Sequence, residues 1–93
     1  MEDVRNFTSD EKIAFLAALH FASKLNGVTI QEEEFIRNLA EDFDVSKKEA
    51  EKALFPYSRE EITEMLGVFT ERRHQLELVK ELFFLGYADL IYL

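Results

Sequence analysis

The residues with the clearest potential for chemistry are carboxylates that follow apolar stretches at two places in the chain. Three consecutive glutamates, residues 32–34, come soon after Asn26, and Asp89 ends an apolar stretch near the C-terminus. Carboxylate and amide oxygens bind hard divalent cations, although calcium takes about six to eight oxygens and magnesium about six. Glutamates in the first turn of a helix are also stabilised by the helix dipole. The residues alone therefore leave two roles open: cation binding, or stabilisation of a helix end.

The other side chains that commonly catalyse reactions form no recognisable arrangement. The chain has no cysteine, which excludes a thiolate zinc site, a cysteine nucleophile and disulfides. His20 lies in an apolar stretch without a second ligand at metal-binding spacing, so we expect a packed, hydrogen-bonded side chain, and His74 is expected on the surface. Ser9, Ser46 and Ser58 are explained as helix caps or first-turn residues. We therefore predict that the protein has no catalytic residues and is not an enzyme.

The composition limits the classes of partner. The 19 acidic and 11 basic residues give a net charge of −8, and acids surround both short basic clusters, so nucleic-acid binding is not expected. No apolar run reaches the roughly 20 residues that a membrane helix needs, and the acidic N-terminus does not resemble a signal peptide. We expect a cytoplasmic protein without a membrane span, in which acidity serves either solubility or cation binding.

A pattern that occurs four times predicts helix starts. A serine or threonine stands three residues before a glutamate, so that the hydroxyl and the carboxylate can bond to each other's free backbone N–H groups. Each pair precedes an apolar stretch with helical spacing. The pairs are Thr8/Glu11, Thr29/Glu32, Ser46/Glu49 and Ser58/Glu61. Four such signals in one short chain predict an all-α fold.

We expect a single-domain bundle of five helices, which begin near residues 9, 30, 47, 59 and 71. The first, over residues 9–25, is apolar on almost all sides, which is typical of a buried helix. The fifth, over residues 71–89, carries Leu76, Val79 and Phe83 on one face, and further leucines widen this face almost all round. The first and fifth helices are therefore predicted to be central and to pack on each other. Residues 1–8 are expected to form an N-terminal tail, and residues 9–93 the domain.

The first and fifth helices also resemble each other in sequence. A shift of 63 positions places Asn26 over Asp89 and matches apolar residues with apolar residues, for example Leu19 with Leu82. Internal similarity of this kind indicates a repeated unit. The second copy of the glutamate run would fall just beyond Leu93, where the chain is still apolar. We therefore expect either truncation of a longer protein or a tail that docks on its own core or on a partner.

One structural unit that occurs twice around a helical core resembles the TerB-like domains. The unit is a buried helix, a short turn and a second helix with glutamates in its first turn. This family includes tellurite-resistance proteins and the N-terminal domain of the co-chaperone DjlA. The first copy is LNGVTIQEEEF at residues 25–35, the second is YADL at residues 87–90, and the turn FDVS at residues 43–46 also agrees. The resemblance covers most of the chain. It implies an all-α bundle in which the acids of the two turns lie close together.

The resemblance also implies a function, because the acids of this family are proposed to bind a divalent cation. Carried over by position, the ligands are Asn26, Glu33 or Glu34, and Asp89. The match is incomplete, since Asn26 has no charge, Leu90 replaces a glycine and the second glutamate is absent. Water would have to complete the coordination. The resemblance thus implies a non-enzymatic domain that binds calcium, magnesium, manganese or zinc weakly, in a tellurite- or stress-response context.

The alternative is a function of a different class, namely a protein–protein interaction module. The apolar segment of residues 85–93 would mark a docking or self-association surface if it is exposed. The acidic face of the helix that begins near residue 30 is the other candidate surface. It carries Glu32, Glu33, Glu41 and Asp42.

Overall fold

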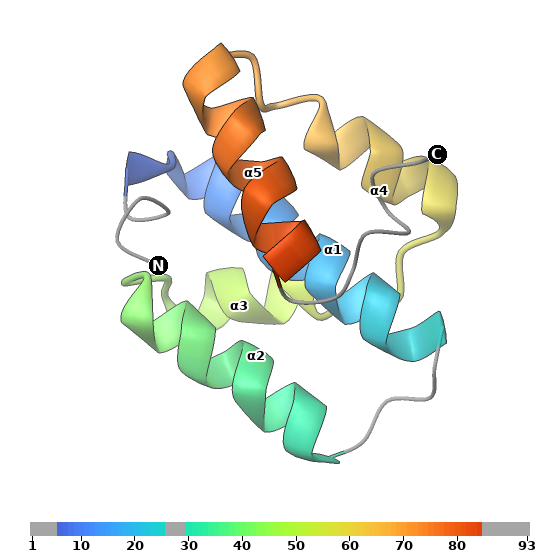
Figure 1. Ribbon diagram of the computed structural model, residues 1–93. Helices are drawn as coiled ribbons and strands as arrows, with labels where there is room; N and C mark the ends of the chain where they lie inside the picture. The colour runs from blue at the N-terminus through green and yellow to red at the C-terminus, as the bar shows by residue number, and fades with distance from the viewer. Residues whose placement is uncertain (1–5, 26–29, 85–93) are drawn as a thin grey trace.

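The computed structural model describes residues 6–25 and 30–84, and these residues form helices joined by short turns (Figure 1). The helices are α1 (Ser9–Leu25), α2 (Ile30–Asp42), α3 (Lys47–Ala53), α4 (Arg59–Leu66) and α5 (Arg72–Phe84). The all-α fold with five helices is therefore confirmed, and each helix starts within one residue of its predicted start. None of the described helices is both long enough and apolar enough to cross a membrane.

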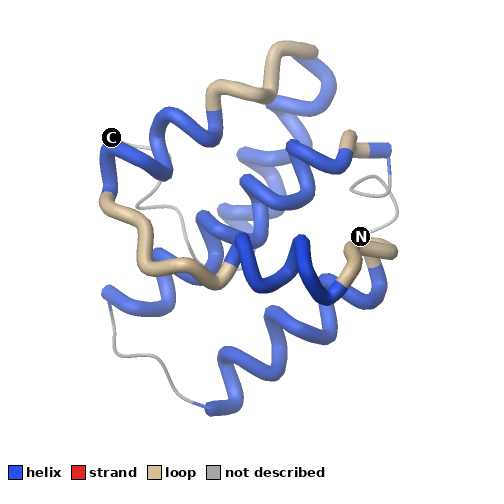
Figure 2. The backbone as a smooth tube through the Cα atoms, turned by 180° about the vertical axis from the view of Figure 1, so that it is seen from behind, coloured by secondary structure: helices blue, strands red, loops and turns tan. Residues whose placement is uncertain are grey.

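α1 is the central helix of the fold. α5 lies in front of α1 in Figure 1, and α3 lies in front of it in the opposite view of Figure 2. α1 also packs directly against α2, α3 and α4. All side chains from residue 14 to residue 20 are buried, His20 included. The prediction of a buried first helix is confirmed, because a helix that is apolar on all sides needs neighbours on all sides.

Reciprocal caps form at the starts of α1 and α4, as predicted. At α1 the backbone N–H of Thr8 donates to Glu11 Oε1 at 2.8 Å, and the N–H of Glu11 donates to the Thr8 hydroxyl at 3.2 Å. Ser58 and Glu61 make the same exchange at the start of α4, at 3.0 and 3.2 Å. The serine before α3 accepts a bond from the backbone of its own glutamate partner. Thr29, the remaining predicted cap, lies outside the described residues.

The faces of α2, α3 and α4 that cover α1 are those that their hydrophobic spacing predicts. The buried apolar residues of these helices and of the turns that follow them are Ile36, Leu39, Ala40, Phe43, Ala53, Ile62 and Phe69. After α2 the chain turns sharply at Asp44, whose φ is 57°. Aspartate is one of the few residues besides glycine that adopts this left-handed conformation readily. The turn closes when Val45 N–H donates to the Ala40 carbonyl at 2.9 Å.

The predicted orientation of α5 is wrong over the described residues. Leu76, Val79 and Phe83 were expected on a buried face but are 60%, 42% and 66% exposed, whereas Leu78 and Leu82 are buried. Both sets have helical spacing, so hydrophobic periodicity does not choose between them. α5 is therefore not a second helix buried on all sides. It covers the core with one face and turns a second apolar face outward.

Phe7 belongs to the packed core, although it was predicted in an N-terminal tail. Its ring is only 4% exposed, lies 5.0 Å from the Phe69 ring and lies 6.2 Å from the Phe15 ring, each measured between centroids. Both contacts are edge-on, a geometry that adds about 0.5–1.5 kcal/mol per pair to the gain from burial. The boundary predicted at residue 8 is therefore too late, and the domain includes Phe7.

Candidate functional site

The structure describes only part of the predicted cation site. Asn26 and Asp89 lie outside the described residues, and so does the apolar segment of residues 85–93. Glu33 lies near the start of α2, and the Glu34 side chain is exposed. Among the residues that the structure describes, no group of three His, Asp or Glu side chains could hold a metal ion. Cation binding by these residues therefore stays a prediction of the family resemblance.

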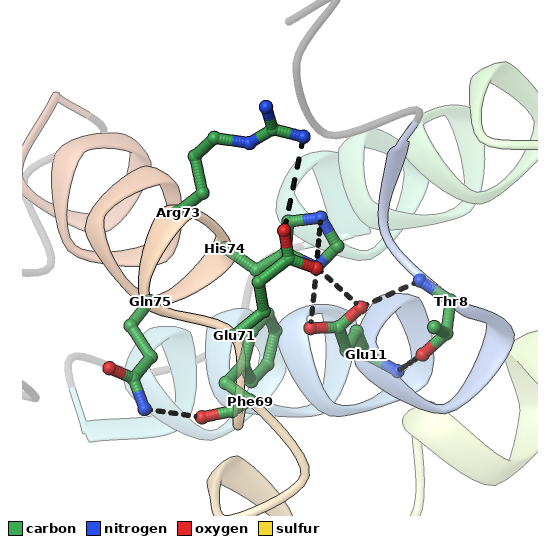
Figure 3. Close-up of polar contacts among 7 residues, drawn as sticks. All are labelled: Thr8, Glu11, Phe69, Glu71, Arg73, His74 and Gln75. Atoms are coloured by element: carbon green, nitrogen blue, oxygen red, sulfur yellow. Dashed lines mark hydrogen bonds and ion pairs between the residues drawn. The ribbon is translucent and has the colours of Figure 1, made fainter.

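The polar contacts that hold α5 centre on His74, which was predicted on the surface but has a side chain only 12% exposed. Its Nδ1 atom lies 2.9 Å from both carboxylate oxygens of Glu11 in α1, and its Nε2 atom lies 3.6 Å from Glu71 Oε2 (Figure 3). The imidazole ring also packs on the Phe7 ring, with 5.3 Å between centroids. His74 therefore joins α5 to α1, between two carboxylates and against the aromatic core.

Glu11 has two structural roles at once. Its carboxylate caps α1 through the Thr8 N–H and also pairs with His74, while the residue is only 3% exposed. A buried carboxylate needs such partners, because removing an ion from water costs several kcal/mol. Glu11 and His74 are 63 residues apart, which is the shift that aligns the first and fifth helices. The sequence held no local signal for this contact, because residues so far apart along the chain are brought together only by the tertiary fold.

Two glutamates also lie on the inward side of α5. Glu81 is 7% exposed, and the Glu77 side chain is 16% exposed. Burial raises the pKa of the Glu81 carboxyl above its ordinary value, and the negative charge of Glu77 and a hydrogen bond with it raise this pKa further. Lys80 Nζ lies 3.3 Å from Glu77 Oε1, and the Lys80 charge opposes the rise. α5 therefore turns its acidic residues toward the protein.

Replacing Glu81 by glutamine tests this burial. Because the pKa is raised in the folded state, the stability linked to Glu81 is present at low pH and is lost as pH rises through the folded-state pKa. We expect Glu81→Gln to raise the free energy of unfolding at about pH 7.5, because the amide carries no charge that burial and Glu77 would penalise. Near pH 4 the variant and the parent should be equally stable. Urea unfolding followed by circular dichroism measures both values, and an equal gain at both pH values would contradict the assignment.

A pocket of about 340 Å³ opens beside this cluster, and its described lining residues are Asn6, Arg73, His74 and Glu77. Both ring nitrogens of His74 face carboxylates, and Glu77 pairs with Lys80. The four lining residues include no serine, threonine or cysteine that could act as a nucleophile. Of these groups, His74 joins α5 to α1, whereas Glu77 pairs within α5 and Arg73 pairs with Glu71 just before it.

The opposite side of α5 presents the most apolar surface of the described residues. Leu76, Val79 and Phe83 follow one another at helical spacing, and they make up three of the six exposed large hydrophobic side chains. By helical geometry Arg72 lies at the N-terminal end of this stripe. Arg73 and Lys80 lie along the edge that adjoins the pocket, which Arg73 also lines. We call these six residues the α5 outer face. No acidic side chain of α5 lies on it, because both glutamates of the helix point inward.

The size of the apolar stripe is that of a small docking surface. Three large side chains that are 42–66% exposed contribute roughly 300 Å² of apolar surface. Contiguous apolar patches of about 300–600 Å² on monomeric proteins often have a function. The chemistry that this surface offers is recognition of a partner rather than catalysis.

Comparisons of the chain with protein-family models, with curated proteins and with solved structures gave no match. The resemblance to TerB-like domains therefore stays a hypothesis, based on the motifs around Asn26 and Asp89. A function for this protein has to be argued from its own surface.

Proposed function

We propose that the protein is a non-enzymatic interaction module and that a protein partner docks on the α5 outer face. The observation that supports this proposal is the orientation of α5. Leu76, Val79 and Phe83 are exposed, while His74 and Glu81 face inward. A helix that only covered its own core would turn its most apolar face inward. The exposed stripe is therefore better explained by a partner that covers it.

The area of the stripe sets the strength of this contact. Burying roughly 300 Å² at about 25 cal/mol per Å² gives about 7.5 kcal/mol before any cost is subtracted. Association costs at least about 4 kcal/mol in lost translational and rotational freedom. The apolar stripe alone therefore supports only a weak complex. A partner that binds more tightly needs additional contacts at the edges of the stripe.

The two surfaces proposed from the sequence are less informative. Residues 85–93 follow α5 in sequence but lie outside the described residues. α2 exposes acidic side chains such as Glu41 and Asp42, and Phe35 is the single exposed large hydrophobic among its described side chains. An isolated exposed hydrophobic residue is normal on a protein surface and indicates no binding site. The α5 outer face is the better candidate, since its apolar residues form a continuous stripe.

Site-specific photocross-linking in the native host cell tests the proposal. A benzophenone amino acid replaces Phe83 on the outer face, and in a matched chain it replaces Phe55. Phe55 is also an exposed phenylalanine, at 55%, but lies in the turn after α3. We expect a discrete cross-linked protein from position 83 that position 55 does not give. Leu76→Gln combined with Val79→Gln should reduce its yield about tenfold or more, since these residues supply much of the apolar contact.

Two results would contradict the proposal. One is the same set of cross-linked products from positions 83 and 55, which would indicate non-specific contact. The other is a discrete product from position 83 that survives the Leu76→Gln and Val79→Gln changes, which would show that the stripe does not bind the partner.

A further inference from the structure

The distribution of charge on α5 points to a specific kind of partner, and this inference rests on the proposed function. We infer that the element that docks on the α5 outer face is an acidic amphipathic helix of another protein. Its apolar residues cover Leu76, Val79 and Phe83, and its carboxylates lie against Arg72, Arg73 and Lys80.

α5 separates its charges between its two sides. Glu77 and Glu81 point inward, whereas the side chains of Arg73 and Lys80 are 82% and 63% exposed and Arg72 is also exposed. The outer face is therefore apolar and cationic on a chain with a net charge of −8. Complementary charge across an interface selects the partner and speeds association. A cationic rim beside an apolar stripe thus favours a partner element that carries acids beside its own apolar residues.

The ion pair that Arg73 already makes is weak enough to exchange for a partner's carboxylates. Arg73 lies 3.8 Å from Glu71 Oε1 in a pair that is exposed on both sides, whereas Lys80 lies 3.3 Å from Glu77, whose side chain is only 16% exposed. Solvent-exposed pairs contribute only about 0–1 kcal/mol each. A partner can therefore add carboxylates at this edge at little cost. These contacts would supply the additional affinity that the apolar stripe alone does not provide.

The shape of the stripe fits a helix. Residues 76, 79 and 83 cover two turns of α5, a distance of about 10 Å along the helix axis. An amphipathic partner helix contacts such a surface through apolar residues that are three and four positions apart in its sequence. The match of length and spacing makes one short helix, rather than a large folded surface, the appropriate occupant.

Charge and area disfavour two other occupants. A second copy of the chain that docked α5 against α5 would bring the same three cations together, and like charges across an interface are unfavourable. Stable dimers also bury about 800 Å² per partner, more than twice the roughly 300 Å² of this stripe. An anionic membrane would attract the cationic rim but repel the rest of a chain with a net charge of −8.

Three synthetic peptides of about 18 residues, or five helical turns, test the inference. They share one leucine stripe on an alanine-rich helix and differ only in the flanking residues, which are glutamate, glutamine or lysine. Fluorescence polarisation measures their binding to the full chain. We expect the glutamate peptide to bind about tenfold or more tightly than the glutamine peptide, and the lysine peptide not to bind. The advantage of glutamate should shrink in about 0.5 M salt, which screens exposed charges.

A charge-reversed protein and a matched control complete the test. The Arg72→Glu, Arg73→Glu, Lys80→Glu triple variant should prefer the lysine peptide. A control triple variant with the same change in net charge, on the exposed lysines Lys47, Lys48 and Lys52 of α3, should keep the glutamate preference. Circular dichroism confirms that both variants are folded.

The outcomes separate the partner's chemistry from the proposed function. If the glutamate and glutamine peptides bind equally and Val79→Gln weakens both, the docking surface stands and the acidic partner is overturned. If no peptide binds, the acidic helix is overturned and the cross-linking result still decides the proposed function. Two further results would replace the inference: co-sedimentation with phosphatidylglycerol vesicles, or a dimer in sedimentation velocity that Val79→Gln abolishes.

Discussion

Replacing Glu11 by alanine is expected to destabilise the protein by about 2.5–4 kcal/mol, because it removes a buried carboxylate hydrogen bond with His74, worth about 1.5–3 kcal/mol, and one acceptor of the helix cap, worth about 1 kcal/mol. The change removes the acceptor of the Thr8 N–H and leaves the His74 ring without the carboxylate that lies 2.9 Å from its Nδ1. A domain of 93 residues has only about 5–14 kcal/mol of stability. Urea unfolding followed by circular dichroism should therefore show a transition at much lower urea concentration.

The matched control for Glu11 is Glu61. It makes the same two capping bonds, with Ser58 at the start of α4, but it is exposed. We expect Glu61→Ala to cost about 1 kcal/mol, the value of a helix cap alone. Equal losses from the two alanine variants would mean that the contact with His74 adds nothing, and that α5 is held to α1 by other interactions.

Replacing Phe7 by alanine is expected to cost about 3–5 kcal/mol, as for other buried phenylalanines. Its ring joins three segments of the fold, because it contacts Phe15 of α1, Phe69 before α5 and the His74 ring. Its loss should therefore loosen α5 as well as the start of α1. Hydrogen exchange of the α5 backbone amides, together with urea unfolding, measures both effects.

Phe55 provides the control for Phe7, because it is 55% exposed and contacts Tyr57 rather than the core cluster. Phe55→Ala should change the free energy of unfolding by no more than about 0.5–1 kcal/mol. A small effect of Phe7→Ala, similar to that of Phe55→Ala, would restore the boundary at residue 8 and the view of Phe7 as a tail residue.

The starts of the helices could be predicted because their signals are local. A Ser or Thr and a Glu three residues later make bonds within one turn, and the pairs at Glu11 and Glu61 form as expected. The central position of α1 could also be predicted, since a helix with apolar residues on all sides has only one favourable environment.

The orientation of α5 could not be predicted from the hydrophobic pattern. Leu78 and Leu82 are buried, whereas Leu76 and Phe83 are exposed, and all four have helical spacing. Tertiary contacts decide which face of α5 is buried, above all the contact of His74 with Glu11, 63 residues away. The two arginines before His74 suggested a surface position, but the His74 side chain is only 12% exposed. The exposed stripe was missed for the same reason.

The predicted cation site depends on residues whose arrangement the structure does not describe. Asn26 and Asp89 belong to the two turns of the family resemblance, and Glu34, the described member of the set, is exposed. Sequence reasoning therefore predicted the fold class and most of the core. The candidate docking surface emerged only from the contacts between α1 and α5.

The proposed function requires that Leu76, Val79 and Phe83 serve binding rather than folding. The most direct test measures the free energy of unfolding of a triple variant with Leu76→Gln, Val79→Gln and Phe83→Gln. The reference for a buried position is the single change Leu82→Gln, since Leu82 is 2% exposed. Glutamine is used because it is nearly as good a helix former as leucine. We predict that the triple variant lies within about 0.5 kcal/mol of the parent, as expected for surface positions, while Leu82→Gln loses several times more. A loss of about 3 kcal/mol or more in the triple variant would place the stripe in the core and contradict the claim.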